Sequence, residues 1–201
     1  LPMVGREREF ALAASLLRRD DVRLLTLTGP GGIGKTRLAL ALIETAGGDY
    51  ANGVYFAPLA AVSDPGLVAS AIARAAGLVE RGDLPVRDSL PDALRQTEAL
   101  LVLDNFEHVL AAAPLLSNLL SSCPRLKMLV TSRTLLRVTG EYALPVPPLS
   151  VVDMNAPDRV NSVPSSPAVE LFAQRGAAVS PSFDLTAANA PIVADICQRL
   201  D

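Results

Sequence analysis

The stretch Gly29-Pro30-Gly31-Gly32-Ile33-Gly34-Lys35-Thr36 decides the fold of this 201-residue chain. It matches the pattern GxxxxGK[ST], in which a glycine-rich turn between a strand and a helix holds the phosphates of a nucleotide. The apolar run at residues 23–28 predicts a strand before it, and residues 35–45 predict a helix after it. The alternative, a glycine-rich turn that only caps a helix, does not require this context.

Each residue type in the motif has a chemical reason. Glycines allow backbone angles that turn successive N–H groups toward phosphate oxygens, and the following helix points its positive end at the same place. Lys35 can reach the β- and γ-phosphates, and the Thr36 hydroxyl can ligate Mg²⁺. The expected nucleotide-binding residues of this segment are Gly29, Pro30, Gly31, Gly32, Ile33, Gly34, Lys35, Thr36 and Arg37.

The rest of the chain alternates apolar, β-prone runs with helical patterns. Strands are predicted at 53–57, 100–103, 127–131 and 142–144, and helices at 64–76, 89–96 and 112–122. Strands that alternate with helices and are apolar on both faces form a parallel sheet. We therefore expect an α/β P-loop NTPase fold with a mainly parallel five-stranded sheet and helices on both faces.

The domain organisation follows from composition. The segment 145–148 (PVPP) ends the regular pattern, so residues 1–149 are expected to form the nucleotide-binding domain. Residues 150–167, rich in Pro, Ser and Asn, are expected to be a linker. Helical pattern resumes at residue 168 and again at residues 190–201, which predicts two helices, and residues 168–201 are expected to be the truncated start of a helical domain.

A second motif ends the apolar run at 100–103. Asp104 at the end of a strand beside a phosphate loop is expected to hold Mg²⁺; otherwise it is an ordinary turn residue. Many ATP-hydrolysing P-loop proteins place a second carboxylate next, but this chain has Asn105, whose amide cannot accept a proton from water. Glu107 could replace it as the catalytic carboxylate, or be a solvated loop charge. His108 is expected to be a structural or surface group, and turnover to be slow.

Arg133 follows the predicted strand at 127–131. In nucleotide-binding sheets of this type, the strand that carries such an arginine lies between the two motif strands. Arg133 would then face the γ-phosphate and contribute to catalysis with Lys35 and Asp104. The alternative is an ordinary surface arginine at the end of a strand.

Composition excludes several other chemistries. The chain has 16 Arg, two Lys, one His and two Cys, with a formal net charge of −3. A Ser-His-Asp triad would have to use His108, and zinc would find few ligands. The charge gives no reason to expect direct nucleic-acid binding. The cysteines, Cys123 and Cys197, are expected to be buried thiols in the cytoplasm, and no apolar run is long enough to span a membrane.

Five segments together resemble the STAND class of signal-transduction P-loop ATPases: VGRERE at 4–9, GPGGIGKTRLAL, LLVLDNFEHVL, LVTSRTLLRVTGEYALPVPPLS and AVELFAQRG. More narrowly, they resemble the NB-ARC/AP-ATPase-like modules of large bacterial regulators. The resemblance implies that Val4 and Arg6 hold the adenosine, the loop the phosphates, Asp104 the Mg²⁺ and Arg133 the γ-phosphate. It also implies further C-terminal domains as partners, and nucleotide-dependent self-association of the full-length protein. Members of the class usually continue, just after the position of Asp201, through a GLPL-type segment into a full helical domain and a winged-helix domain, so this sequence is expected to stop within the helical domain.

The resulting hypothesis is a regulatory switch that binds ATP or ADP with Mg²⁺ and hydrolyses ATP slowly to ADP and phosphate. One alternative is a small-substrate phosphotransferase or another hydrolysing ATPase, which would need a basic lid and an acceptor site. A GTPase would need an Asn-Lys-x-Asp segment, and the only lysine besides Lys35 is Lys127, in the wrong context. An interaction module with a vestigial loop is at odds with the intact Lys35, Thr36 and Asp104.

Overall fold

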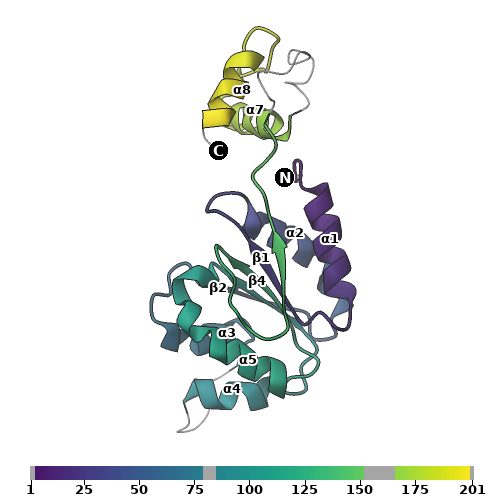
Figure 1. Ribbon diagram of the computed structural model, residues 1–201, viewed down its shortest axis with the longest axis vertical. Helices are drawn as coiled ribbons and strands as arrows, with labels where there is room; N and C mark the ends of the chain where they lie inside the picture. The colour runs from purple at the N-terminus through teal and green to yellow at the C-terminus, as the bar shows by residue number, and fades with distance from the viewer. Residues whose placement is uncertain (1–2, 79–84, 152–165, 200–201) are drawn as a thin grey trace. The chain divides into compact units, whose positions relative to one another are not determined.

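The computed structural model describes residues 3–78, 85–151 and 166–199 (Figure 1). The chain divides into two compact units, Glu9–Val146 and a second unit made of Leu1–Arg8 and Pro147–Asp201. The predicted boundary at residue 149 stays a prediction. Most of the predicted linker, residues 152–165, lies outside the described residues.

A five-stranded sheet forms the centre of the larger unit. Every strand pair is parallel, and the strand order is β2-β3-β4-β1-β5. The predicted fold class is thus confirmed, and the arginine-bearing strand β4 does lie between the two motif strands, β1 and β3. The strands are β1 (Leu24–Thr28), β2 (Val54–Pro58), β3 (Leu100–Asp104), β4 (Lys127–Ser132) and β5 (Glu141–Pro145).

Helices cover both faces of this sheet. The chain crosses the sheet in one direction from β1 to β2 and in the other from β2 to β3 and from β3 to β4. Since crossovers between parallel strands share one hand, the helix after β1 is expected on one face and the helices of the other two connections on the opposite face. Figure 1 shows α3, α4 and α5 gathered together, away from α1 and α2. The helices are α1 (Glu7–Arg18), α2 (Lys35–Ala46), α3 (Val68–Ala75), α4 (Val86–Leu94) and α5 (Ala113–Ser122), with short 3₁₀ turns η1 (Gly47–Asp49), η2 (Pro65–Leu67) and η3 (Phe106–Ala112).

Alternate residues of the strands build the core under α3, α4 and α5. Leu101, Leu103, Met128 and Val130 join one hydrophobic cluster with the buried faces of these helices. The intervening strand residues, such as Val102 and Leu129, are equally buried, which explains why the central strands are apolar throughout.

The helix expected at 64–76 is divided into η2 and α3, and two further differences from the sequence-based expectation have a clear physical reason. Helix α4 begins at Val86, before the predicted start at Ser89, because the Pro85 carbonyl accepts from the N–H groups of Asp88 and Ser89. Helix α1 was not predicted at all. Its buried residues are Ala13, Ala14 and Leu17, and such small side chains give a weak apolar pattern.

The smaller unit contains the two helices expected beyond the linker. Helices α7 (Pro167–Val179) and α8 (Ala190–Arg199) pack through Val169, Val193 and Cys197, and the rings of Phe172 and Phe183 make an edge contact. Cys197 and Cys123 are both free and buried, as predicted, and burial raises the pKa of each thiol.

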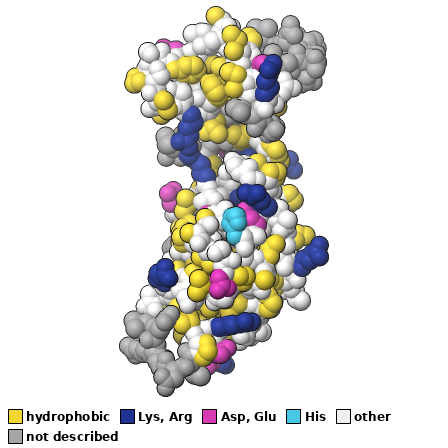
Figure 2. Space-filling view, turned by 90° about the vertical axis from the view of Figure 1, so that its left-hand side faces the viewer, with side chains coloured by type: hydrophobic (Ala, Val, Ile, Leu, Met, Phe, Trp, Pro, Cys, Tyr) yellow, Lys and Arg dark blue, Asp and Glu magenta, His cyan; other side chains and the backbone are white. Residues whose placement is uncertain are grey.

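The described helices include none with both the length and the apolar character needed to cross a membrane. Figure 2 shows one face of the molecule, on which acidic and basic side chains are interspersed rather than gathered into a continuous patch of one sign.

Candidate nucleotide-binding site

Three neighbouring strands bring the sequence motifs together. In this parallel sheet β4 pairs with β3 on one side and with β1 on the other, so the ends of all three strands meet at one edge. The loop Gly29–Thr36 follows β1, Asp104 ends β3, and Arg133 follows β4. Ligands of open α/β sheets bind at this carboxyl edge.

The loop needs glycine at specific positions. Gly29, Gly32 and Gly34 all have positive φ, of 146°, 81° and 96°. A Cβ on Gly29 would lie 2.6 Å from the Val146 carbonyl oxygen and 2.4 Å from Cδ1 of Ile33, so a side chain there has no room. Gly34 is the left-handed residue at the start of α2, where helix N–H groups are available to an anion.

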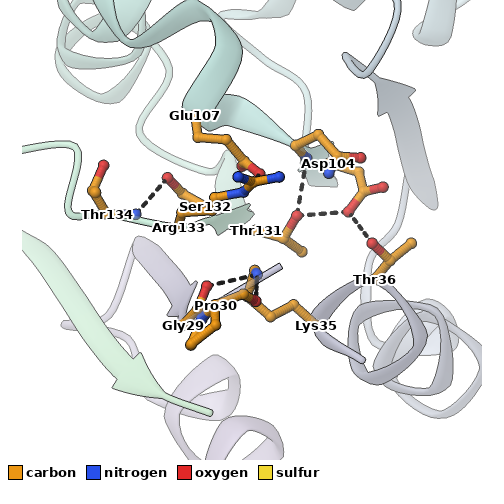
Figure 3. A network of polar contacts seen from close by, with 11 residues as sticks. Gly29, Pro30, Lys35, Thr36, Asp104, Glu107, Thr131, Ser132, Arg133 and Thr134 are labelled. Atoms are coloured by element: carbon orange, nitrogen blue, oxygen red, sulfur yellow. Dashed lines mark hydrogen bonds and ion pairs between the residues drawn. The ribbon is translucent and has the colours of Figure 1, made fainter. Parts of the chain in front are cut away.

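Lys35 is folded back onto its own loop. Its Nζ donates to the carbonyl oxygens of Gly29 at 2.8 Å and Pro30 at 2.7 Å (Figure 3), and the residue is buried. Burial lowers the pKa of Lys35. The nearby charge of Arg133 lowers this pKa further, whereas the carboxylates of Glu107 and Asp104 partly offset the decrease. The ammonium group is thus partly desolvated and surrounded by the other candidate residues, where its attraction for phosphate is stronger than in water.

Asp104 is the centre of a hydrogen-bond network. Its Oδ1 accepts from the hydroxyl of Thr36 at 2.7 Å and from the hydroxyl of Thr131 at 2.6 Å, while the backbone N–H of Asn105 donates to Thr131 at 2.9 Å (Figure 3). The proton of Thr36 points to Asp104, so the lone pairs of its Oγ1 remain for a metal. A hydroxyl and a carboxylate are hard oxygen donors, and this pair fits Mg²⁺.

Glu107 and Arg133 form an ion pair beside this network. Arg133 Nε lies 3.2 Å from Oε1 of Glu107, whose side chain is only 10% exposed, whereas that of Arg133 is 59% exposed. Glu107 is therefore not a solvated loop charge. Its second oxygen, Oε2, is buried and has no hydrogen-bond partner among the described residues. A Cβ on Gly31 would lie 3.3 Å from an Nη of Arg133, so the guanidinium lies against the phosphate loop.

The segment between Asp104 and Glu107 has an unusual backbone. Asn105 has a φ of 62°, in the left-handed region, and precedes the 3₁₀ turn η3. Asparagine tolerates this conformation better than most residues. His108 is exposed, in line with a surface group, and no group of three or more His, Cys, Asp or Glu in the described segments could hold a metal ion by itself.

Three further predicted site residues are placed less directly. Arg37 is half-buried in the first turn of α2. Val4 and Arg6 are buried and belong to the smaller unit, where Gly5 packs so closely on Pro167 that a Cβ on it would clash with the proline ring. Their assignment to the adenosine, and that of Arg37 to the nucleotide, stay predictions.

Sequence reasoning missed the role of Thr131. It is fully buried on β4, and its hydroxyl holds both the Asp104 carboxylate and the Asn105 backbone. A signal was available in the sequence, because Thr131 follows an apolar run in the same way as Asp104 follows the apolar run of β3. Residues at the ends of adjacent parallel strands lie next to each other.

Comparisons with known proteins agree with this geometry. The profile of a protein family described as "AAA domain" matches residues 18–141. "Putative HTH-type transcriptional regulator Rv0890c" of Mycobacterium tuberculosis is 40% identical over 180 residues, which are 89% of this chain but 19% of that protein. "Uncharacterized protein Rv0894" of the same organism is 38% identical over 199 residues, 98% of this chain and 47% of that protein. The chain thus spans less than half the length of these relatives.

A solved structure shows the same fold. The crystal structure of Cdc6p from Pyrobaculum aerophilum superimposes with a TM-score of 0.59 at 17% sequence identity, over 86% of this chain and 49% of that one. At this identity the likeness concerns the fold alone. The family match covers the strands β1 to β4 and every residue of the loop, the acidic strand end and Arg133. The chain therefore belongs to the family of AAA domains, which are P-loop ATPase domains.

Proposed function

We propose that this domain is an ATP-dependent regulatory switch that binds ATP or ADP with Mg²⁺ and hydrolyses ATP slowly. The single observation that supports this most strongly is the shared oxygen of Asp104, which accepts from Thr36 of the phosphate loop and from Thr131 of β4. This contact joins the phosphate loop to β4, which Arg133 follows. A nucleotide bound in the loop can therefore alter the position of that strand end.

Binding would use the loop as a cradle. The backbone N–H groups of Gly29–Thr36 and the start of α2 would hold the phosphate oxygens, and Lys35 would exchange its two carbonyl partners for the β- and γ-phosphates. Thr36 and Asp104 would hold Mg²⁺, which neutralises phosphate charge when bound. Val4 and Arg6 would hold the adenosine, as the family resemblance implies.

Hydrolysis would proceed by in-line attack of water, assisted mainly by electrostatic stabilisation. Lys35 and Arg133 would stabilise the charge that develops on the transferred phosphoryl group. Asn105 cannot act as a general base. The nearest replacement is Glu107, whose Oε2 has no hydrogen-bond partner among the described residues but is buried, so the attacking water would reach it only after the site rearranges. Because this carboxylate is also bound to Arg133, slow turnover is expected.

The output of the switch would lie in other domains of a longer protein. One relative is named as an HTH-type transcriptional regulator and is about five times as long as the matched segment. We propose that nucleotide exchange here alters how C-terminal domains pack or self-associate, and so regulates transcription. Direct nucleic-acid contact by this segment is not part of the proposal, in keeping with its net charge of −3.

Ligand-induced thermal stabilisation tests the proposal. Mg·ATP at 1,000 times Kd should stabilise the domain by about 4 kcal/mol. For a chain of this size, each kcal/mol raises Tm by roughly 2–4 °C. Lys35→Ala should remove this shift. The chain's other lysine provides a matched control, because Lys127 Nζ also donates to two carbonyl oxygens but lies at the start of β4, at the opposite edge of the sheet.

Lys127→Ala should lower the starting Tm and keep the nucleotide shift. No shift in folded wild-type protein with either ATP or ADP would refute the proposal. A turnover of roughly 10 per second or more, in the range of metabolic enzymes, would favour the phosphotransferase alternative over a slow switch.

A further inference from the structure

The ion pair between Glu107 and Arg133 is asymmetric. The carboxylate is nine-tenths buried at the first turn of η3, whereas the guanidinium is more than half exposed. Phe106 and Val109, on either side of this carboxylate in sequence, are fully buried and anchor the turn. Glu107 is thus the fixed partner, and Arg133 is the partner whose orientation depends on the contact.

The contact uses one particular atom of the guanidinium. Nε of Arg133 is the atom paired with Oε1 of Glu107, at 3.2 Å. One Nη, Cζ and Nε of the guanidinium lie 3.3, 3.4 and 3.6 Å from the position of a Cβ on Gly31. The guanidinium is planar and its five N–H groups point in fixed directions. Anchoring Nε therefore fixes where the terminal nitrogens lie, and the guanidinium is held beside Gly31 of the phosphate loop.

We propose that Glu107 is a positioning residue for Arg133: it holds the guanidinium through Nε so that the terminal nitrogens face the γ-phosphate position over Gly31. The role rests on the proposed function, since it requires a nucleotide in the loop. In this role Glu107 contributes to the preference of the domain for ATP over ADP. This contribution is distinct from activation of the attacking water. One carboxylate can have both roles, because Oε1 is paired with Arg133 and Oε2 has no partner among the described residues.

Two observations favour positioning over a merely structural ion pair. Oε2 of Glu107 is buried and has no donor among the described residues, which costs folding free energy. An ion pair that served only stability would be expected to have both carboxylate oxygens paired. In addition, the loop has glycine at the place where a side chain would touch the guanidinium, so the approach of Arg133 to the loop backbone is unobstructed.

Affinities for Mg·ATP and Mg·ADP, measured by calorimetry on the 201-residue chain, test the proposal. Arg133→Ala should lower the ratio of ATP to ADP affinity by roughly 10- to 100-fold, the range expected for a charge-assisted hydrogen bond. Glu107→Ala should lower it to a similar extent, and the double variant should be no worse than Arg133→Ala. Affinity for Mg·ADP, which has no γ-phosphate, should stay within about threefold in all three variants, which also shows that they are folded.

The conservative variant separates positioning from water activation. Glu107→Gln keeps an oxygen that can accept from Nε, so it should retain most of the ATP preference while turnover falls. Glu98→Ala is the matched control, because it removes an exposed glutamate paired with Arg125 before β3, and it should change neither quantity.

Three results would overturn the proposal: Glu107→Ala with the wild-type affinity ratio, losses in Glu107→Ala and Arg133→Ala that add in the double variant, or Arg133→Ala with the wild-type ratio. If Arg133→Ala itself leaves the ratio unchanged, Arg133 does not read the γ-phosphate and Glu107 has nothing to position. Failure of the proposed function is a different result, in which the wild-type chain binds neither nucleotide.

Discussion

Thr131 donates a 2.6 Å hydrogen bond to Oδ1 of Asp104, from the strand next to the one that Asp104 ends. The same hydroxyl accepts from the Asn105 N–H, so one buried side chain sets both the carboxylate and the left-handed turn after it. The Thr131 hydroxyl thus holds in place both the Asp104 carboxylate and the turn that leads to Glu107.

Thr131→Val keeps the shape of this side chain and removes the hydroxyl. The Asn105 N–H then loses its acceptor, and unfolding free energy should fall by about 1–3 kcal/mol. The dependence of ATP affinity on Mg²⁺ concentration should also weaken, because Asp104 is less well oriented. Urea unfolding and a Mg²⁺ titration measure the two effects; wild-type values in both would contradict this role.

Thr26→Val provides the opposite case on the neighbouring strand. Thr26 is fully buried on β1, directly opposite Val130, and its hydroxyl has no hydrogen-bond partner within the described part of the chain. Removing an unsatisfied hydroxyl should leave stability unchanged or raise it, by up to about 1–3 kcal/mol. A loss as large as that of Thr131→Val, in the same urea experiment, would show that Thr26 has a partner.

Arg23→Lys should destabilise the domain although the charge is kept. Arg23 precedes β1 and donates to the carbonyl oxygens of Leu120, Cys123 and Leu126, in and after α5. A lysine ammonium cannot reproduce the planar fork, so one or more carbonyls lose a donor, at about 1–3 kcal/mol. Arg95→Lys, in an exposed pair with Asp92, should change stability by less than about 0.5 kcal/mol. Equal effects in thermal or urea unfolding would contradict this assignment.

Asp21 makes stability depend on pH in the acid range. Its bonds to Arg19 and Tyr142 lower its pKa from 3.8 to about 2. Because the folded-state pKa is below the unfolded one, the contribution to stability is present above pH 3.8 and is lost as the pH falls through about 2. The Tm of wild type should therefore exceed that of Asp21→Asn at pH 6, and the difference should shrink toward pH 2. A difference independent of pH would count against this ion pair.

The fold could be predicted from the sequence because its main signals are local. The glycine loop requires a strand before it and a helix after it, and four further apolar runs supplied the other strands. The position of β4 between β1 and β3 was predicted from the type of sheet and is confirmed. Helix α1 was missed because Ala13 and Ala14, which it buries, add little to a hydrophobic pattern.

The candidate site was only partly predictable for a physical reason. Which residues follow each strand can be read from the chain, but which of them touch depends on strand register and on individual backbone angles. Thr131 meets Asp104 through the pairing of β3 with β4, and the burial of Glu107 follows from the left-handed turn at Asn105. Neither the pairing nor the turn leaves a periodic pattern in the sequence.

The strand order also determines when the site can form during synthesis. Leu24 of β1 pairs with Met128 on one side and with Glu141 on the other, and β1 does not pair with β2, the next strand in the chain. The phosphate loop is therefore synthesised early, but its strand has no neighbour until more than half of the domain has left the ribosome. Long-range pairing of this kind is slow. ATP should accordingly bind only at the end of folding, as a ligand that stabilises the finished sheet rather than a template around which it forms.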